Sequence, residues 1–147
     1  MADADVLAAD LFCDGQARAA LDCVREHSWL RLIASEQLLA DAKAVIEDLA
    51  DRALAADWHD RISDEIRLVD HAPQDHPAVA SAAAAGAAHV LTLEESLAGA
   101  GANLSLQSQL RVSIRTPAAF VASFDAASLY EATHEDAYPG PDADPRG

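Results

Sequence analysis

The chain has 147 residues, with 25 acidic against 10 basic side chains and a formal net charge of −15. This length suits one domain with a buried core, and the charge argues against a protein that binds by neutralising phosphates. No apolar run reaches the ~18 residues of a membrane span, and the start of the chain lacks the pattern of a signal peptide. We therefore expect a cytoplasmic protein.

The acidic residues are spread along the chain, Lys43 is the only lysine, and aromatic residues make up only 5%. We expect a core of aliphatic and small side chains. The composition resembles proteins of salt-accumulating halophilic archaea, whose surface charges are screened over ~3 Å in about 1 M salt. An acidic interaction protein is the less favoured alternative. Cys13 and Cys23 form no CxxC pattern, so we expect free thiols.

The first half of the chain alternates between strand and helix patterns. A short strand is expected to end near Asp3. Apolar residues at helical spacing predict a helix over 16–27, and a strand over 29–33 follows it. Ser35 is the expected N-cap of a long amphipathic helix over 36–56. A shorter helix is expected over 58–68.

The second half begins with Asp75-His-Pro, which is typical of a helix start. The helix that follows is rich in alanine, and Gly86 is its expected C-cap. Residues 89–91 predict a short buried strand. Thr92 and Glu95 have the spacing of a capping box for the next helix.

A strand over 112–114 then leads to Thr116-Pro117, an N-cap followed by proline at the first helical position. The alternation predicts an α/β fold, a three-layer α/β/α sandwich with a small central parallel sheet. This domain is expected to cover residues 1–128. The segment 129–147 is acidic and contains proline and glycine, and we expect it to be disordered.

Four acidic residues draw attention by their positions: Asp3, Asp41, Asp75 and Glu94. Three of them stand at junctions between elements, and Asp41 lies within the long helix. Residues at the carboxyl ends of parallel strands can meet at one edge of the sheet. Carboxylates suit hard cations such as Mg²⁺ or Mn²⁺, which activate a bound water for phosphodiester cleavage.

The order of these motifs resembles that of the PIN-domain nucleases. Asp75, the alanine-rich helix to Gly86 and Thr92-Leu-Glu94 fall at the family's intervals, as does the strand that leads to Thr116-Pro117 and an aromatic residue. Asp3 matches the family's first acidic residue and Asp41 its second. The chain departs from the family at two positions, with Asp41 where glutamate is usual and Glu94 where aspartate is usual.

The resemblance implies a PIN-type endoribonuclease with Asp3, Asp41, Asp75 and Glu94 as catalytic residues. Of these, Asp3, Asp75 and Glu94 are the expected ligands of Mg²⁺ or Mn²⁺. It also implies RNA as substrate, and a homodimer or an antitoxin-like protein as partner. Arg111 and Arg115 are four apart on a strand and share one face, so they are candidates for binding the substrate.

Each acidic residue also has an ordinary interpretation. Asp75 can act as an N-cap alone, Glu94 can favour the positive end of its helix, and Asp3 and Asp41 can be solvated surface acids. The six histidines match no common zinc motif, although His76 could assist at a metal site. The alternative function is a catalytically inactive PIN-like binding or interaction domain.

Overall fold

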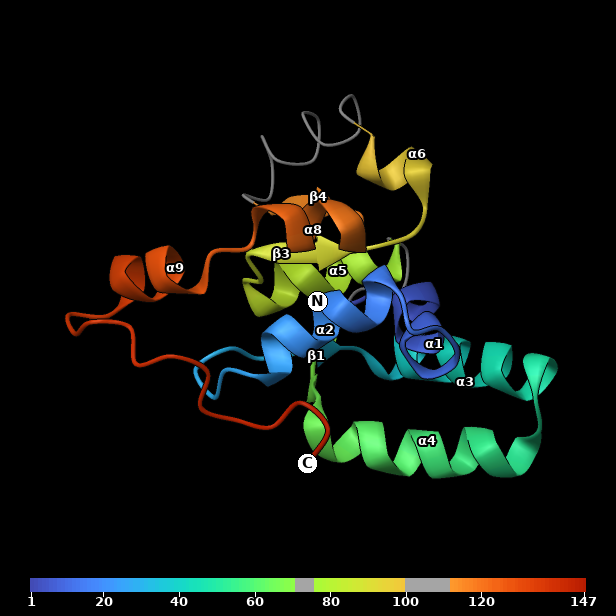
Figure 1. Ribbon diagram of the computed structural model, residues 1–147. Coiled ribbons are helices and arrows are strands. Elements are labelled where there is room, and N and C mark those ends of the chain that lie inside the picture. The colour runs from blue at the N-terminus through green and yellow to red at the C-terminus, as the bar shows by residue number, and fades with distance from the viewer. Residues whose placement is uncertain (71–75, 100–111) are drawn as a thin grey trace.

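The computed structural model describes residues 1–70, 76–99 and 112–147 (Figure 1). Asp75 and Arg111, two of the predicted site residues, lie outside these ranges. The elements are, in chain order, α1 (Ala4–Phe12), α2 (Gln16–Arg25), β1 (Ile33–Ala34), α3 (Glu36–Leu49), α4 (Arg52–Glu65), β2 (Arg67–Leu68), α5 (Pro77–Ala85), β3 (His89–Leu91), α6 (Glu95–Ala98), β4 (Ser113–Arg115), α8 (Pro117–Ser123) and α9 (Ala126–Thr133). The predicted α/β class is confirmed, and helices dominate the described residues.

Two short parallel sheets, β1–β2 and β3–β4, are joined through the extended segment 1–3. The Ala2 N–H donates to the Ile33 carbonyl at 3.3 Å on one side. On the other side, the Leu91 N–H donates to Met1 and the Asp3 N–H donates to Leu91, each at 2.9 Å. The strands therefore lie in the order β2, β1, residues 1–3, β3, β4.

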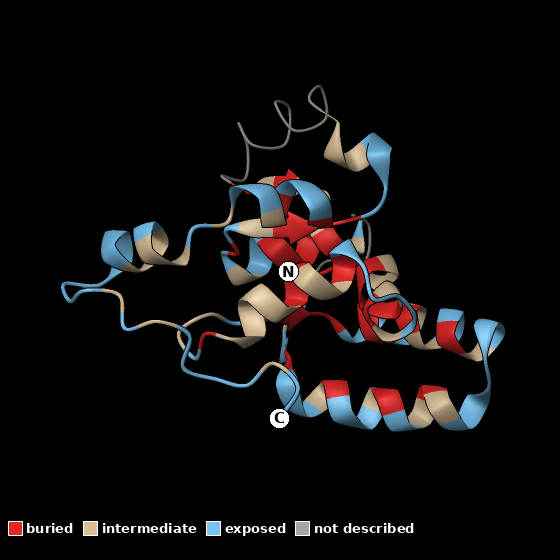
Figure 2. Cartoon of the chain, in the orientation of Figure 1, coloured by how far each residue is buried: buried red, intermediate tan, exposed pale blue. Residues whose placement is uncertain are grey.

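The core is aliphatic, as the composition predicts. Its fully buried members include Val6, Leu7, Leu38, Ile46 and Val90. Figure 2 shows buried residues on the central strands and on the inner faces of the helices around them. Alanine at the helix contacts lets α1, α3 and α4 approach closely, and the cost is a core with few large side chains to bury. Cys13 and Cys23 are free thiols, as expected.

The long helix predicted over 36–56 is wrong, because the chain breaks there into α3 and α4. Ala50 has φ −132° and ψ −96°, outside the helical region. The Asp51 carboxylate then accepts a hydrogen bond from the Leu54 N–H at 2.9 Å and caps a new helix. α3 and α4 fold back and pack against each other. Both helices therefore need an apolar face, and the apolar pattern in the sequence continues across the break.

The helix predicted over 58–68 ends early, and its last residues form β2. The Arg67 N–H donates to the Leu32 carbonyl and the Val69 N–H donates to Ala34, each at 3.0 Å. Pairing with a strand distant in sequence overrides the local helical pattern here. The preceding strand, predicted over 29–33, is likewise confined to Ile33–Ala34.

Several predicted helix ends are confirmed. Ser35 and Thr116 accept hydrogen bonds from Leu38 N–H and Ala119 N–H, and Gly86 adopts the left-handed conformation at φ 63°. The capping box of Thr92 and Glu95 is wrong, since the N-cap of α6 is Glu94. The Thr92 hydroxyl is engaged elsewhere, with a carboxylate described below.

The structure describes the segment 129–147, for which the sequence predicts disorder. It completes α9 and then runs back along the molecule, so that the C-terminus lies beside the end of α4 (Figure 1). The Asp142 carboxylate accepts a hydrogen bond from Ser28 N–H at 2.7 Å, and Arg146 donates to Asp22 at 2.8 Å. These contacts join the last residues of the chain to α2 and to the segment that follows α2.

None of the helices in the described ranges has both the length and the apolar character that crossing a membrane requires.

Candidate metal site at the carboxyl end of the sheet

Asp3 ends the extended segment 1–3 and is the N-cap of α1. One carboxylate oxygen accepts a hydrogen bond from the Ala4 N–H at 2.9 Å, and the other accepts one from the Thr92 hydroxyl at 2.9 Å. The residue is only 8% exposed. The positive end of the α1 dipole favours a carboxylate at this position, and the two hydrogen bonds hold the Asp3 side chain in a fixed orientation.

Thr92 links Asp3 to Glu94. It directly follows β3, and its N–H donates to the carbonyl of Arg115 at 3.1 Å, which fixes it against β4. Its hydroxyl donates to Asp3 and accepts a hydrogen bond from the Glu94 N–H at 3.1 Å. One buried hydroxyl thus sets the spacing between two acidic residues that are 91 positions apart in the chain.

The Glu94 carboxylate lies between a hydroxyl and an imidazole. The Ser96 hydroxyl donates to Oε1 at 2.5 Å, and His76 Nε2 lies 3.4 Å from Oε2. The hydrogen bond from Ser96, followed by the contact with His76, lowers the pKa of Glu94. The side chain is half exposed, so an incoming ligand can reach it.

Asp5 adds a further carboxylate to this edge. It accepts hydrogen bonds from the Val6 N–H at 2.7 Å and the Leu93 N–H at 3.1 Å. Burial raises the pKa of Asp5, and the charge of Asp3 adds to the effect. The two backbone hydrogen bonds to Asp5 lower its pKa, but they do not outweigh its burial and the nearby negative charge of Asp3.

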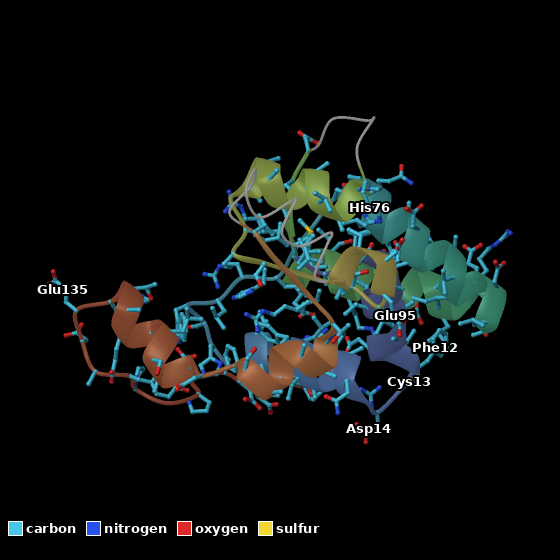
Figure 3. All side chains as sticks on the ribbon, turned by 90° about the horizontal axis from the view of Figure 1, so that it is seen from above. Phe12, Cys13, Asp14, His76, Glu95 and Glu135 are labelled. Atoms are coloured by element: carbon cyan, nitrogen blue, oxygen red, sulfur yellow. The ribbon has the colours of Figure 1, made fainter. Side chains whose placement is uncertain are left out.

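Asp3, His76 and Glu94 each offer one ligand atom, and these atoms all lie within 4.8 Å of one another. Two ligands on opposite sides of a Mg²⁺-sized ion are ~4.2 Å apart, so small side-chain movements would bring all three onto one cation. Figure 3 labels His76 at the start of α5 and Glu95 at the start of α6, which are the two elements that meet here. The donor set of two carboxylates and one imidazole fits a divalent metal.

The structure therefore brings together Asp3 and Glu94 of the four predicted acidic residues, and Asp75 lies outside the described residues. Asp41 is not part of this group. It is half exposed on α3, where its carboxylate accepts a hydrogen bond from the Gln37 amide at 2.7 Å. An i, i+4 contact on the helix surface accounts for this side chain.

Sequence reasoning gave His76 only an assisting role and assigned Thr92 to a helix cap. Each had a signal in its position, since His76 precedes the proline that opens α5 and Thr92 directly follows a buried strand. Arg115, a predicted substrate-binding residue, makes its contacts within the protein. Its guanidinium donates to the hydroxyls of Ser113 at 2.9 Å and Ser123 at 2.6 Å, which lie at the start of β4 and the end of α8.

The fold and this group define an α/β protein with a carboxylate–imidazole cluster at the carboxyl end of its parallel strands. The chain belongs to a family of unknown function, DUF7384, whose pattern matches residues 1–146. No curated protein and no solved structure matches it.

Proposed function

We propose that this protein is a metal-dependent endoribonuclease of the PIN type, with the three-layer sandwich of that family and a divalent cation held by Asp3, His76 and Glu94. The observation that carries the proposal is the spacing of the three ligand atoms, all within 4.8 Å of one another. The carboxylates of Asp3 and Glu94 lie close together here, and the charge of Asp3 also acts on the neighbouring Asp5. A cation at this point would turn the repulsion into attraction.

The strand order supports this location. From the segment 1–3 the chain passes to β1 and β2 on one side, and later to β3 and β4 on the other. Open α/β sheets bind ligands outside the carboxyl ends of their strands, where the strand order reverses in this way. Asp3 and Thr92 directly follow the two strand segments that flank this reversal.

The chain's own residues divide the chemistry among them. Asp3 and Glu94 would hold the cation, Thr92 orients both, and His76 adds a nitrogen ligand. A cation bound there supplies a water of lowered pKa and stabilises charge on the phosphate. Because imidazole suits transition metals better than Mg²⁺, this ligand set favours Mn²⁺ over Mg²⁺.

A catalytically inactive PIN-like binding domain is the second candidate. It is favoured by Asp41, which bonds to Gln37 and is not part of the ligand group. A site that lacks Asp41, the match to the family's second acidic residue, could bind a metal without cleaving RNA. The interaction with RNA or with a protein partner would then be the function.

The test is cleavage of single-stranded RNA with Mn²⁺ in high-salt buffer, run beside calorimetric titration of Mn²⁺. The Asp3→Asn variant is expected to lose at least about 100-fold in kcat/KM, together with most of its Mn²⁺ affinity. Asp14→Asn is the matched control, because its carboxylate is 93% exposed. Cleavage that survives Asp3→Asn would end the nuclease proposal, and Mn²⁺ binding without cleavage by the wild type would select the second candidate.

A further inference from the structure

Arginine is concentrated in one place in this acidic chain. Of the ten basic residues in the sequence, five line a single pocket of about 670 Å³: Arg18, Arg25, Arg31, Arg61 and Arg146. Four acidic side chains share the lining, namely Asp10, Asp64, Glu65 and Asp144. Counted by Arg, Asp and Glu side chains alone, the lining carries a formal charge of +1, whereas the whole chain carries −15.

Three of these arginines are used within the protein. Arg25 pairs with Asp10 at 2.7 Å and with Glu65 at 2.5 Å. Arg146 pairs with Asp22 at 2.6 Å, so residues 144–147, which line one side of the pocket, are held to α2. Arg18 donates to the carbonyl of Asp10 at 2.9 Å. These contacts explain why the three are present without any ligand.

Arg31 and Arg61 are different. Arg31 donates to the carbonyls of Ser28 and Leu30, and Arg61 donates to the carbonyl of Asp57 at 3.3 Å. Within the part of the chain that the structure describes, neither guanidinium has a carboxylate within ion-pair distance. Both groups bond to backbone carbonyls instead, so among the described residues neither guanidinium forms an ion pair, although the pocket is also lined by carboxylates.

The same pocket has an apolar floor. Its accessible apolar residues are Leu11, Val24 and Leu30, which are half buried. Leu32, Trp58 and Ile62 also line it but are almost fully buried. The volume lies within the ~300–1,000 Å³ of small-molecule sites. Guanidinium groups match the geometry of phosphate through paired N–H donors. An apolar floor beneath a cationic rim suits a ligand with one anionic group and one apolar face.

We propose that this pocket binds a small phosphorylated organic molecule with a flat apolar body, of the mononucleotide type. Arg31 and Arg61 hold the phosphate, and the apolar floor of Leu11, Val24 and Leu30 receives the body. The site is separate from the metal site, because Asp3 lies at the start of α1 whereas Asp10 and Leu11 line the pocket near its other end. At 1.5 Å per residue, seven residues of helix separate the two by about 10 Å.

The experiment is calorimetric titration of the full chain with inorganic phosphate, AMP and ATP, at constant ionic strength and without divalent metal. The wild type is expected to bind a nucleotide more tightly than inorganic phosphate. The double variant R31A/R61A should bind it at least about tenfold more weakly, because two charge-assisted contacts are lost. Arg52→Ala is the matched control, since Arg52 is exposed on the same helix as Arg61 but does not line the pocket.

Three results would overturn the proposal: no binding of any probe by the wild type at millimolar concentration, equal affinity of the wild type and R31A/R61A, or inorganic phosphate binding as tightly as AMP. Circular dichroism of each variant checks that it is folded, which is expected because both arginines are exposed. Since no metal is present, failure here leaves the nuclease assay unaffected.

Discussion

Asp3 and Asp10 are both buried on the same helical segment, at 8% and 6% exposed, but their surroundings differ in charge. Asp10 accepts two hydrogen bonds from Arg25, at 2.7 and 3.1 Å, and lies 3.6 Å from Arg146. Asp3 accepts hydrogen bonds only from a hydroxyl and a backbone N–H among the described residues. The charge of Asp10 is neutralised by the protein, whereas Asp3 pairs with no lysine or arginine among the described residues, and the proposed cation would offset its charge.

The largest expected effect is on stability at Asp10. Asp10→Ala should lower the free energy of unfolding by about 3 kcal/mol, because it removes one partner of a buried ion pair. Arg25 keeps Glu65 and Asp22 as partners, which places the loss at the lower end of the usual range. Asp3→Asn should change stability by less than about 1 kcal/mol in metal-free buffer, since an amide keeps the shape without the unpaired charge. Urea unfolding of both variants measures the difference, and equal losses would erase the contrast between the two aspartates.

The next largest effect is on metal affinity. It tests whether the Thr92 hydroxyl holds Asp3 and Glu94 in place for the proposed cation. Thr92→Val removes the hydroxyl that contacts Asp3 and Glu94 and should weaken Mn²⁺ binding by about tenfold. Thr116→Val is the control, because it removes a similar hydroxyl from the N-cap of α8 and should cost only about 1 kcal/mol of stability. Calorimetric titration of Mn²⁺ should separate the two variants, and equal affinities would show that Thr92 does not organise the ligands.

The smallest effect concerns His89 at the amino end of β3. This end carries a histidine, whereas Asp3 and Glu94 lie near the carboxyl end of the same strand. Burial lowers the pKa of His89 below its ordinary value of 6.5, and the charge of Arg115 adds to the effect. Its ring also packs against Phe120, with the ring centroids 5.6 Å apart. Below pH 6.5 the unfolded chain binds a proton that the folded chain resists, so stability should fall as the pH falls through that value.

Thermal unfolding between about pH 7.5 and 5.5 tests this dependence on His89. His89→Gln cannot take up the proton and should flatten the pH profile. A profile of the same slope in wild type and His89→Gln would assign the pH dependence to other groups.

The features predicted well from the sequence are those determined within a few residues. Ser35, Gly86 and Thr116 end or begin helices through contacts with their own neighbours, so local chemistry is enough. The break at Asp51 was missed because the apolar stripe continues through it. β2 was missed because only pairing with β1, more than 30 residues away, makes it a strand.

The candidate site likewise contains residues that the local sequence predicts and contacts that form only between distant parts of the chain. Asp3 and Glu94 were predicted from their places after strands, and parallel strands bring such places together. The contact of Thr92 with Asp3, at a separation of 89 residues, has no local signal. The position of Asp41 beside the apolar stripe does not say which way a surface carboxylate turns, so its contact with Gln37 has no signal of this kind in the sequence.

The segment 1–3 lies between two sheets whose strands all come later in the chain: β1 and β2 within residues 33–68, and β3 and β4 within residues 89–115. Met1 bonds to His89 across 88 residues, and Ala2 bonds to Ile33 on the opposite side. Neither half of the sheet can be completed without this shared strand, so the protein is expected to unfold cooperatively. High contact order of this kind also slows folding. Asp3 ends that strand, so the ligand group forms only when the halves join, and metal affinity would then report on folding of the whole domain.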